Sequence, residues 1–170
     1  APTDAFAASN LVYYPVEGGK ITFDTSSGTI TNCDRNVTSA IIPEQIEEVG
    51  VVAIQDRAFE SCRSLNAISI PDGVTVIGER AFMNCIRLSK IDIPNSVASI
   101  AGWAFYECRN LADVYYDGAA SEWEKISIGV HNEGLDNALI HFLRSVTITK
   151  VTPETVGVEL YNKEPVTVYP

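Results

Sequence analysis

The sequence predicts an α/β repeat protein, a short solenoid of stacked coils made mostly of β-strand and turn. One segment occurs three times at a constant step of 23 residues, beginning at Ala58-Phe59, Ala81-Phe82 and Ala104-Phe105. Cysteine, leucine and branched apolar residues follow each pair in the same columns. A unit this short buries its apolar side chains only by stacking on the next copy. The pattern therefore predicts a solenoid and directs the search for function to a surface.

Composition and charge exclude several classes of function. With 170 residues, 46% hydrophobic and 20% charged, the chain has the material for one packed core. Its formal net charge of −10 repels phosphate backbones, so we expect no nucleic-acid partner. The sequence has no run of about 18 apolar residues, and we expect no direct membrane insertion. We also expect a monomer.

Residues 1–32 are expected to form an N-terminal leader and a capping hairpin. The chain begins with Ala1 instead of Met, and its first ten residues are small and polar, as residues after a signal cleavage site often are. Residues 20–24 and 28–31 alternate in character around a short polar turn, which predicts a β-hairpin. This hairpin would cover the first coil, whose strand edges are otherwise unpaired.

Residues 33–118 are predicted to form about four coils. In each regular coil, Leu-x-x-Ile-x-Ile-Pro alternates as a half-buried strand does, and the proline ends the strand. A second short apolar run follows, and Ala-Phe-x-x-Cys then makes a tight helical or 3₁₀ turn. The first coil, residues 33–57, carries five additional residues around 47–51. We expect these to form a bulging loop.

The pattern changes after residue 118. Residues 119–142 are expected to form a C-terminal cap, with a short helix over 121–126 and a strand that ends at residues 138–142. Ser121 is the expected N-cap, and Glu124 stands at the capping-box position. Residues 143–170 alternate again, which predicts either a β-rich tail or the start of a further domain.

The repeated columns resemble those of the BspA-type leucine-rich repeat family. The match is carried by residues 65–85, which read LNAISIPDGVTVIGERAFMNC, and it extends in phase over residues 28–142. Ala101 departs from the pattern, where glycine would be usual, and the third coil lacks its proline. The resemblance implies a right-handed leucine-rich-repeat solenoid. It is similar to secreted and surface proteins of host-associated bacteria, several of them implicated in adhesion to host proteins or other cells.

The four cysteines occupy one column of the repeat. Cys33, Cys62, Cys85 and Cys108 are separated by 29, 23 and 23 residues. Side chains in one ladder run parallel, whereas a disulfide needs Cβ atoms that turn toward each other. We favour a column of buried free thiols, with a disulfide as the alternative. An evenly spaced ladder does not converge on a point, so we expect no metal site, and the sequence predicts no cofactor.

One outward face of the strands is the candidate partner-binding face. Phe59, Phe82, Phe105 and Tyr116 fall in columns that we expect to be buried. Tyr115 alternates with Tyr116 and is expected to face solvent, on the strand surface that solenoids use to hold partners. The residues that share this outward direction are Ser39, Ile41, Ser69, Lys90, Asp92, Asp113 and Tyr115. An ordinary solvated sheet face is the alternative interpretation.

The sequence favours a binding module over an enzyme. His131 and His141 are the two histidines, both within the predicted cap, and no nucleophile-elbow, metalloprotease or phosphate-loop motif is present. We therefore expect a non-catalytic, secreted or cell-surface module that binds a host or cell-surface protein. Two alternatives remain open. One is a structural spacer within a larger surface protein, and the other is a hydrolase with a site in the cap.

Overall fold

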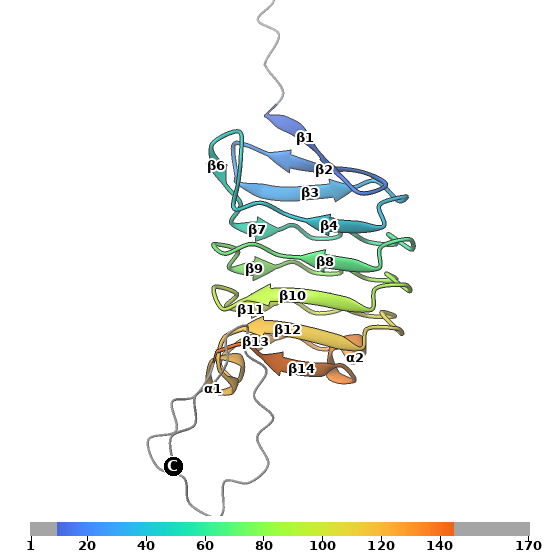
Figure 1. Ribbon diagram of the computed structural model, residues 1–170, viewed down its shortest axis with the longest axis vertical. Helices are drawn as coiled ribbons and strands as arrows, with labels where there is room; N and C mark the ends of the chain where they lie inside the picture. The colour runs from blue at the N-terminus through green and yellow to red at the C-terminus, as the bar shows by residue number, and fades with distance from the viewer. Residues whose placement is uncertain (1–9, 145–170) are drawn as a thin grey trace, which may run out of the picture.

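The protein is a stack of strand-and-turn coils, seen in a computed structural model that describes residues 10–144 (Figure 1). Two sheets run the length of the stack, and each regular coil adds one strand to each sheet. This confirms the predicted fold class of a mostly-strand repeat solenoid. The predicted tail beyond residue 144 lies outside the described residues.

The strands are short, and most pair in parallel with the strand one coil away. The seven-stranded sheet contains, in spatial order, β1 (Leu11–Val16), β2 (Gly19–Asp24), β3 (Thr29–Cys33), β7 (Ala53–Ile54), β9 (Val76–Ile77), β11 (Ser99–Ile100) and β13 (Ser127–Ile128). The five-stranded sheet contains β14 (Leu139–Phe142), β12 (Asp113–Asp117), β10 (Lys90–Pro94), β8 (Ala67–Ser69) and β4 (Ser39–Ile41). Parallel pairing keeps equivalent residues in register, so each column of the sequence becomes a row across a sheet.

The N-terminal end is closed by antiparallel strands. β2 and β3 form the predicted hairpin, and β1 pairs with the outer edge of β2. Three side chains of β2 and β3 are fully buried and cover the first parallel coil: Ile21, Phe23 and Ile30. Pro15 lies within β1, the outermost strand, where a missing N–H disturbs no inner ladder.

The five additional residues of the first coil form a separate small hairpin. β5 (Gln45–Ile46) pairs with β6 (Val49–Gly50). The two turn residues, Glu47 and Glu48, have φ values of 50° and 62°. Two successive left-handed residues are the signature of the tight turn that fits the twist of a hairpin. The predicted loop is therefore found at the predicted place, in the form of a paired hairpin.

The core consists of ladders that cross the coils. Phe59, Phe82 and Phe105 stack face to face, with ring centroids 5.0 and 5.2 Å apart, as the sequence predicted. All four cysteines are buried and free. The Sγ of Cys85 donates to the carbonyl of Phe59 at 3.1 Å, and the Sγ of Cys108 donates to that of Phe82 at 3.0 Å. Burial raises the pKa of Cys108 to about 12 and raises that of Cys85 further.

The Ala-Phe-x-x-Cys segments form the predicted tight turns. In each, the cysteine N–H donates to the phenylalanine carbonyl three residues earlier, at 3.0 to 3.3 Å. Two left-handed residues bound each turn, such as Arg80 and Asn84 with φ values of 58° and 61°. The backbone then donates across the stack, from Phe59 N to the carbonyl of Ala81 and from Phe82 N to that of Ala104, both at 2.8 Å.

The C-terminal region, residues 119–142, adds one strand to each sheet. β13 pairs in parallel with β11, and β14 pairs in parallel with β12. Two single-turn helices connect them, α1 (Ala120–Trp123) and α2 (Glu133–Asp136). The predicted short helix is present, but its predicted N-cap, Ser121, was wrong, because the N-cap lies two residues earlier. Its N-cap is Ala119, whose N–H donates to Glu122 Oε2 at 2.8 Å, so Glu122 takes the position expected for Glu124.

The side chain of Asn132 supplies the last bond in the series that joins the phenylalanine N–H of each turn to the next coil. It is 1% exposed, and its Oδ1 accepts from Phe105 N at 2.9 Å, where the preceding coils use a backbone carbonyl. Its Nδ2 donates to the carbonyls of Ala101 and Gly129 at 3.1 and 2.8 Å. The side chain therefore satisfies the Phe105 N–H, which a further regular coil would otherwise satisfy, and also two backbone carbonyls.

Candidate binding face

The five-stranded sheet brings all seven predicted face residues onto one surface. The parallel register aligns them in two rows, each of which crosses the sheet from β4 to β14. The first row is Ser39, Ala67, Lys90, Asp113 and Leu139. The second row is Ile41, Ser69, Asp92, Tyr115 and His141. The inward neighbours of these residues, such as Ile68, Ile91 and Val114, are buried in the core.

The two ends of the face differ in character. At the β4 end, Ile41 is 79% exposed. The Ser39 hydroxyl beside it donates to the carboxylate of Glu17, which forms a bridge to Ser39 from the N-terminal hairpin. Tyr115 lies three strands away, which corresponds to about 14 Å at the usual strand spacing. Ile41 and Tyr115 thus lie in the same row with Ser69 and Asp92 between them.

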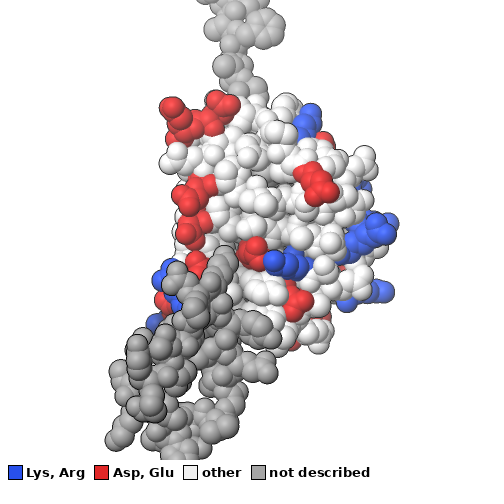
Figure 2. All heavy atoms as spheres, viewed as in Figure 1, with Lys and Arg blue, Asp and Glu red and all other residues white. Residues whose placement is uncertain are grey.

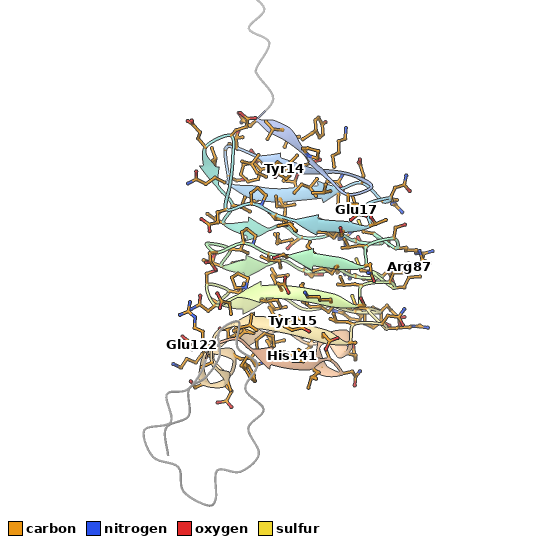
Figure 3. The ribbon with its side chains drawn as sticks, viewed as in Figure 1. Tyr14, Glu17, Arg87, Tyr115, Glu122 and His141 are labelled. Atoms are coloured by element: carbon orange, nitrogen blue, oxygen red, sulfur yellow. The ribbon has the colours of Figure 1, made fainter. Side chains whose placement is uncertain are left out.

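The β12 end carries a cluster of contacting aromatic and charged side chains, seen around Tyr115 and His141 in Figure 3. The rings of Tyr115 and His141 stack with centroids 4.5 Å apart and planes 12° apart. The Nζ of Lys90 lies 4.7 Å from the centroid of the Tyr115 ring and 3.6 Å from Asp92 Oδ1. His141 Nε2 lies 2.7 Å from Asp113 Oδ1. We call these five residues the face cluster.

An open hollow of about 460 Å³ adjoins the face cluster. Its walls come from the carboxyl-terminal halves of β8, β10 and β12, together with the residues that follow them. The lining side chains include Ser69, Lys90, Asp92, Tyr115 and Asp117. Half-buried aromatic and charged groups around a concave surface are the features that bind a partner's side chain.

Two residues of the face were not predicted from the sequence. Leu139 and His141 continue the two rows on β14, although their positions predicted a place in the cap. Leu139 is 62% exposed, whereas His141 is 9% exposed and stacked. A signal was present, because the alternation in residues 139–142 repeats that in residues 113–116. The step between them is 26 residues instead of 23, so the periodic pattern did not include it.

The two histidines differ in burial, because His131 is exposed and His141 is buried, but each pairs with an acid. His131 packs on Trp103 with ring centroids 4.0 Å apart, and its Nδ1 lies 3.5 Å from Glu133 Oε1. His141 pairs with Asp113, as described above. These contacts give each histidine an acidic partner. Within residues 10–144, no three His, Cys, Asp or Glu side chains gather as metal ligands.

The repeat pattern, the two-sheet stack and the ladders agree with one family. The family model for the BspA type leucine-rich repeat region matches residues 26–129 in six copies. The chain belongs to the BspA-type leucine-rich repeat family. No curated protein matches the chain. Membership confirms the resemblance that the columns of residues 65–85 indicated.

Solved leucine-rich repeat structures share the fold. The chain is similar to a T. pallidum leucine-rich repeat protein, with a TM-score of 0.51 and 25% identity, over 67% of this chain and 54% of that one. The chain therefore spans about half the length of that relative. A Bacteroides capillosus leucine-rich repeat protein gives a TM-score of 0.54 and 24% identity, over 76% of this chain and 98% of that one. The pneumococcal vaccine antigen PcpA gives a TM-score of 0.51 and 18% identity, over 86% of this chain and 40% of that one.

Proposed function

We propose that this BspA-type repeat region is a non-catalytic adhesion module that binds a protein partner through the outer face of the five-stranded sheet. The observation that carries the proposal is the face cluster, in which the half-buried Tyr115 is held between Lys90 and His141 beside an open hollow. Aromatic residues supported in this way are frequent anchors of protein interfaces. The adjacent charges would determine the orientation of the partner.

The rigidity of the sheet supports this mechanism. The side chains of the face stand on strands whose inward neighbours are completely buried, and ring stacking and ion pairs already hold Tyr115 and Lys90 in place. A preformed surface loses little conformational entropy on association, so more of the contact energy appears as affinity. The exposed Ile41 would add apolar contact at the other end of the same row.

The place of action that we propose is the outside of a bacterial cell, either secreted or on the surface. Family membership supports it, since repeats of this type occur in bacterial surface proteins and leucine-rich repeats generally mediate contacts between proteins. No helix in the described part of the chain has the length and apolar character needed to cross a membrane. A host or cell-surface protein is the partner class that we propose, with the module acting as a monomer.

A capture experiment tests the face with matched controls. The module would be immobilised and exposed to surface-biotinylated proteins from host epithelial cells. The face variant carries Tyr115→Ala and Ile41→Ser. The control variant carries Tyr13→Ala and Val76→Ser, which remove an exposed tyrosine and an exposed branched apolar residue from the other sheet. We expect the face variant to lose most of the captured protein and the control variant to retain it. Equal capture by both variants and the native module would refute the proposed face.

A further inference from the structure

The charges of this acidic chain are unevenly distributed over the stack. Figure 2 shows Asp and Glu side chains gathered along the upper part of the left edge, and several Lys and Arg side chains along the right edge, where an acidic side chain also lies. The acidic edge includes the carboxyl ends of the strands of the five-stranded sheet and the turns that follow them, for example at Glu44, Asp72 and Asp117. The right edge consists of the turns that precede these strands, where Arg87 projects outward (Figure 3).

Three arginines in the turns of the right edge have no acidic partner in the described part of the chain. Arg35, Arg63 and Arg87 each follow a cysteine of the ladder by one or two residues, so they come from three successive coils. All three are exposed, and within residues 10–144 none of them forms a salt bridge. Arg109, in the following coil, differs because it forms a salt bridge with Glu107. We call Arg35, Arg63 and Arg87, together with the hollow that Arg87 lines, the basic edge.

The hollow at the basic edge has a volume of about 520 Å³. Every lining residue carries a hydroxyl, an amide or a guanidinium group: Thr38, Ser64, Asn66, Arg87, Ser89 and Asn110. These residues come from four successive coils. The hollow beside the face cluster includes aromatic and aliphatic side chains in its lining, whereas the hollow at the basic edge includes none.

The net charge of −10 does not prevent an anion from binding here. The acidic turns lie at the other end of the strands, and a five-residue strand spans about 16 Å. That separation is about two Debye lengths at physiological ionic strength, so exposed charges on the acidic edge are largely screened from the basic edge. Arg87 is the charged residue among those that line the hollow.

We propose that the basic edge binds a linear sulfated polysaccharide. Coils stack at about 5 Å, so the turns that carry the three arginines span about 10 Å along the stack. A polymer with repeated sulfate groups can reach successive turns of this kind, and a guanidinium group can donate two parallel N–H bonds to the oxygens of one oxyanion. The surrounding hydroxyl and amide groups suit the hydroxyls of sugar rings. The absence of aromatic side chains from the lining argues against stacked nucleic-acid bases and against a typical protein hot spot.

Heparin binding tests the proposal, with the whole chain as analyte. Affinity for immobilised heparin would be measured at about 50 mM and about 150 mM NaCl, with neutral dextran and poly-glutamate as comparison ligands. We expect heparin to bind, poly-glutamate to bind more weakly, and dextran not to bind. Arg63→Gln with Arg87→Gln should weaken heparin binding about fivefold or more and reduce its salt dependence.

The control removes the same charge from the opposite edge. Lys125→Gln with Arg144→Gln is such a variant, because Arg144 pairs with Asp117 at the far end of β12. Its affinity should stay within about twofold of the native value. Arg63→Lys with Arg87→Lys keeps the charge and should retain most of the binding, which separates a lost contact from a lost fold. The proposal fails if heparin does not bind, if both glutamine variants weaken binding equally, or if poly-glutamate binds more tightly than heparin.

Discussion

Asn132 offers the sharpest test of how the stack is closed at its C-terminal end. Its Oδ1 accepts from Phe105 N and so replaces the backbone carbonyl of a further coil, while its Nδ2 donates to two other carbonyls. In Asn132→Ala, the N–H of Phe105 and the carbonyls of Ala101 and Gly129 lose this partner. Asn132 is 1% exposed, so water does not readily replace the amide.

The expected loss of stability in Asn132→Ala follows from the three hydrogen bonds that the side chain makes. Each buried hydrogen bond contributes about 0.5–1.5 kcal/mol net, and leaving a buried group without a partner costs about 1–3 kcal/mol. These contributions are not additive, and we expect the free energy of unfolding to fall by about 2–4 kcal/mol. Urea-induced unfolding followed by circular dichroism would measure the change, with the midpoint and slope fitted separately.

Asn137→Ala is the matched control, because Asn137 is exposed and its Nδ2 makes one hydrogen bond, to the carbonyl of Glu133 at 2.7 Å. We expect this substitution to cost less than about 1 kcal/mol. A loss below about 1 kcal/mol for Asn132→Ala, or equal losses for the two variants, would refute the idea that Asn132 closes the turn ladder.

Three further predictions concern the interior of the stack. Phe82→Ala should cost roughly 3–5 kcal/mol in urea unfolding, because Phe82 is fully buried between two stacked rings, and a loss below about 1 kcal/mol would show that the ladder is not core. Gly78→Ala should lower the free energy of unfolding by about 1–3 kcal/mol, because the added Cβ would lie 2.5 Å from Asp56 N. Gly50→Ala is the control in the same assay and should change stability little, because the space around Gly50 is open. The pKa of Cys108 is raised from 9.0 to about 12, so the folded state keeps a proton that the unfolded chain loses. Its contribution to the free energy of unfolding is complete below pH 9 and is lost as the pH rises toward 12, by at most about 1.4 kcal/mol per pH unit. Urea unfolding measured across this alkaline range should show a smaller fall of stability with pH for Cys108→Ala than for the native chain.

The repeat made most of the architecture predictable. Five in-phase columns required stacked coils, and parallel stacking then determined that Phe59, Phe82 and Phe105 form one ladder. The same register put Ile41 and Tyr115 on one outward row, because residues in a strand alternate between faces. These inferences succeeded because they depend on period and alternation, which are properties of the sequence.

The errors and omissions lie where the period is broken. Ser121 was chosen as the N-cap of the first helix on residue type, but the helix begins after Ala119, where the chain leaves β12 and Glu122 can reach back. Asn132 received no role, since its partners are backbone groups of residues 3, 27 and 31 positions away. His141 was assigned to the cap because the step that brings it beside Tyr115 is longer than the regular repeat.

The sequence by itself determined the coil, its inward columns and the outward rows of the sheet, because a 23-residue unit with fixed apolar positions has one way to bury them. The tertiary structure alone decided what the outward residues contact. The stack of Tyr115 on His141, the free guanidinium groups of the basic edge and the closure by Asn132 all depend on which turns lie one coil apart and how far their side chains reach. Burial follows from periodicity, whereas contacts between exposed groups follow from distances that only the folded stack defines.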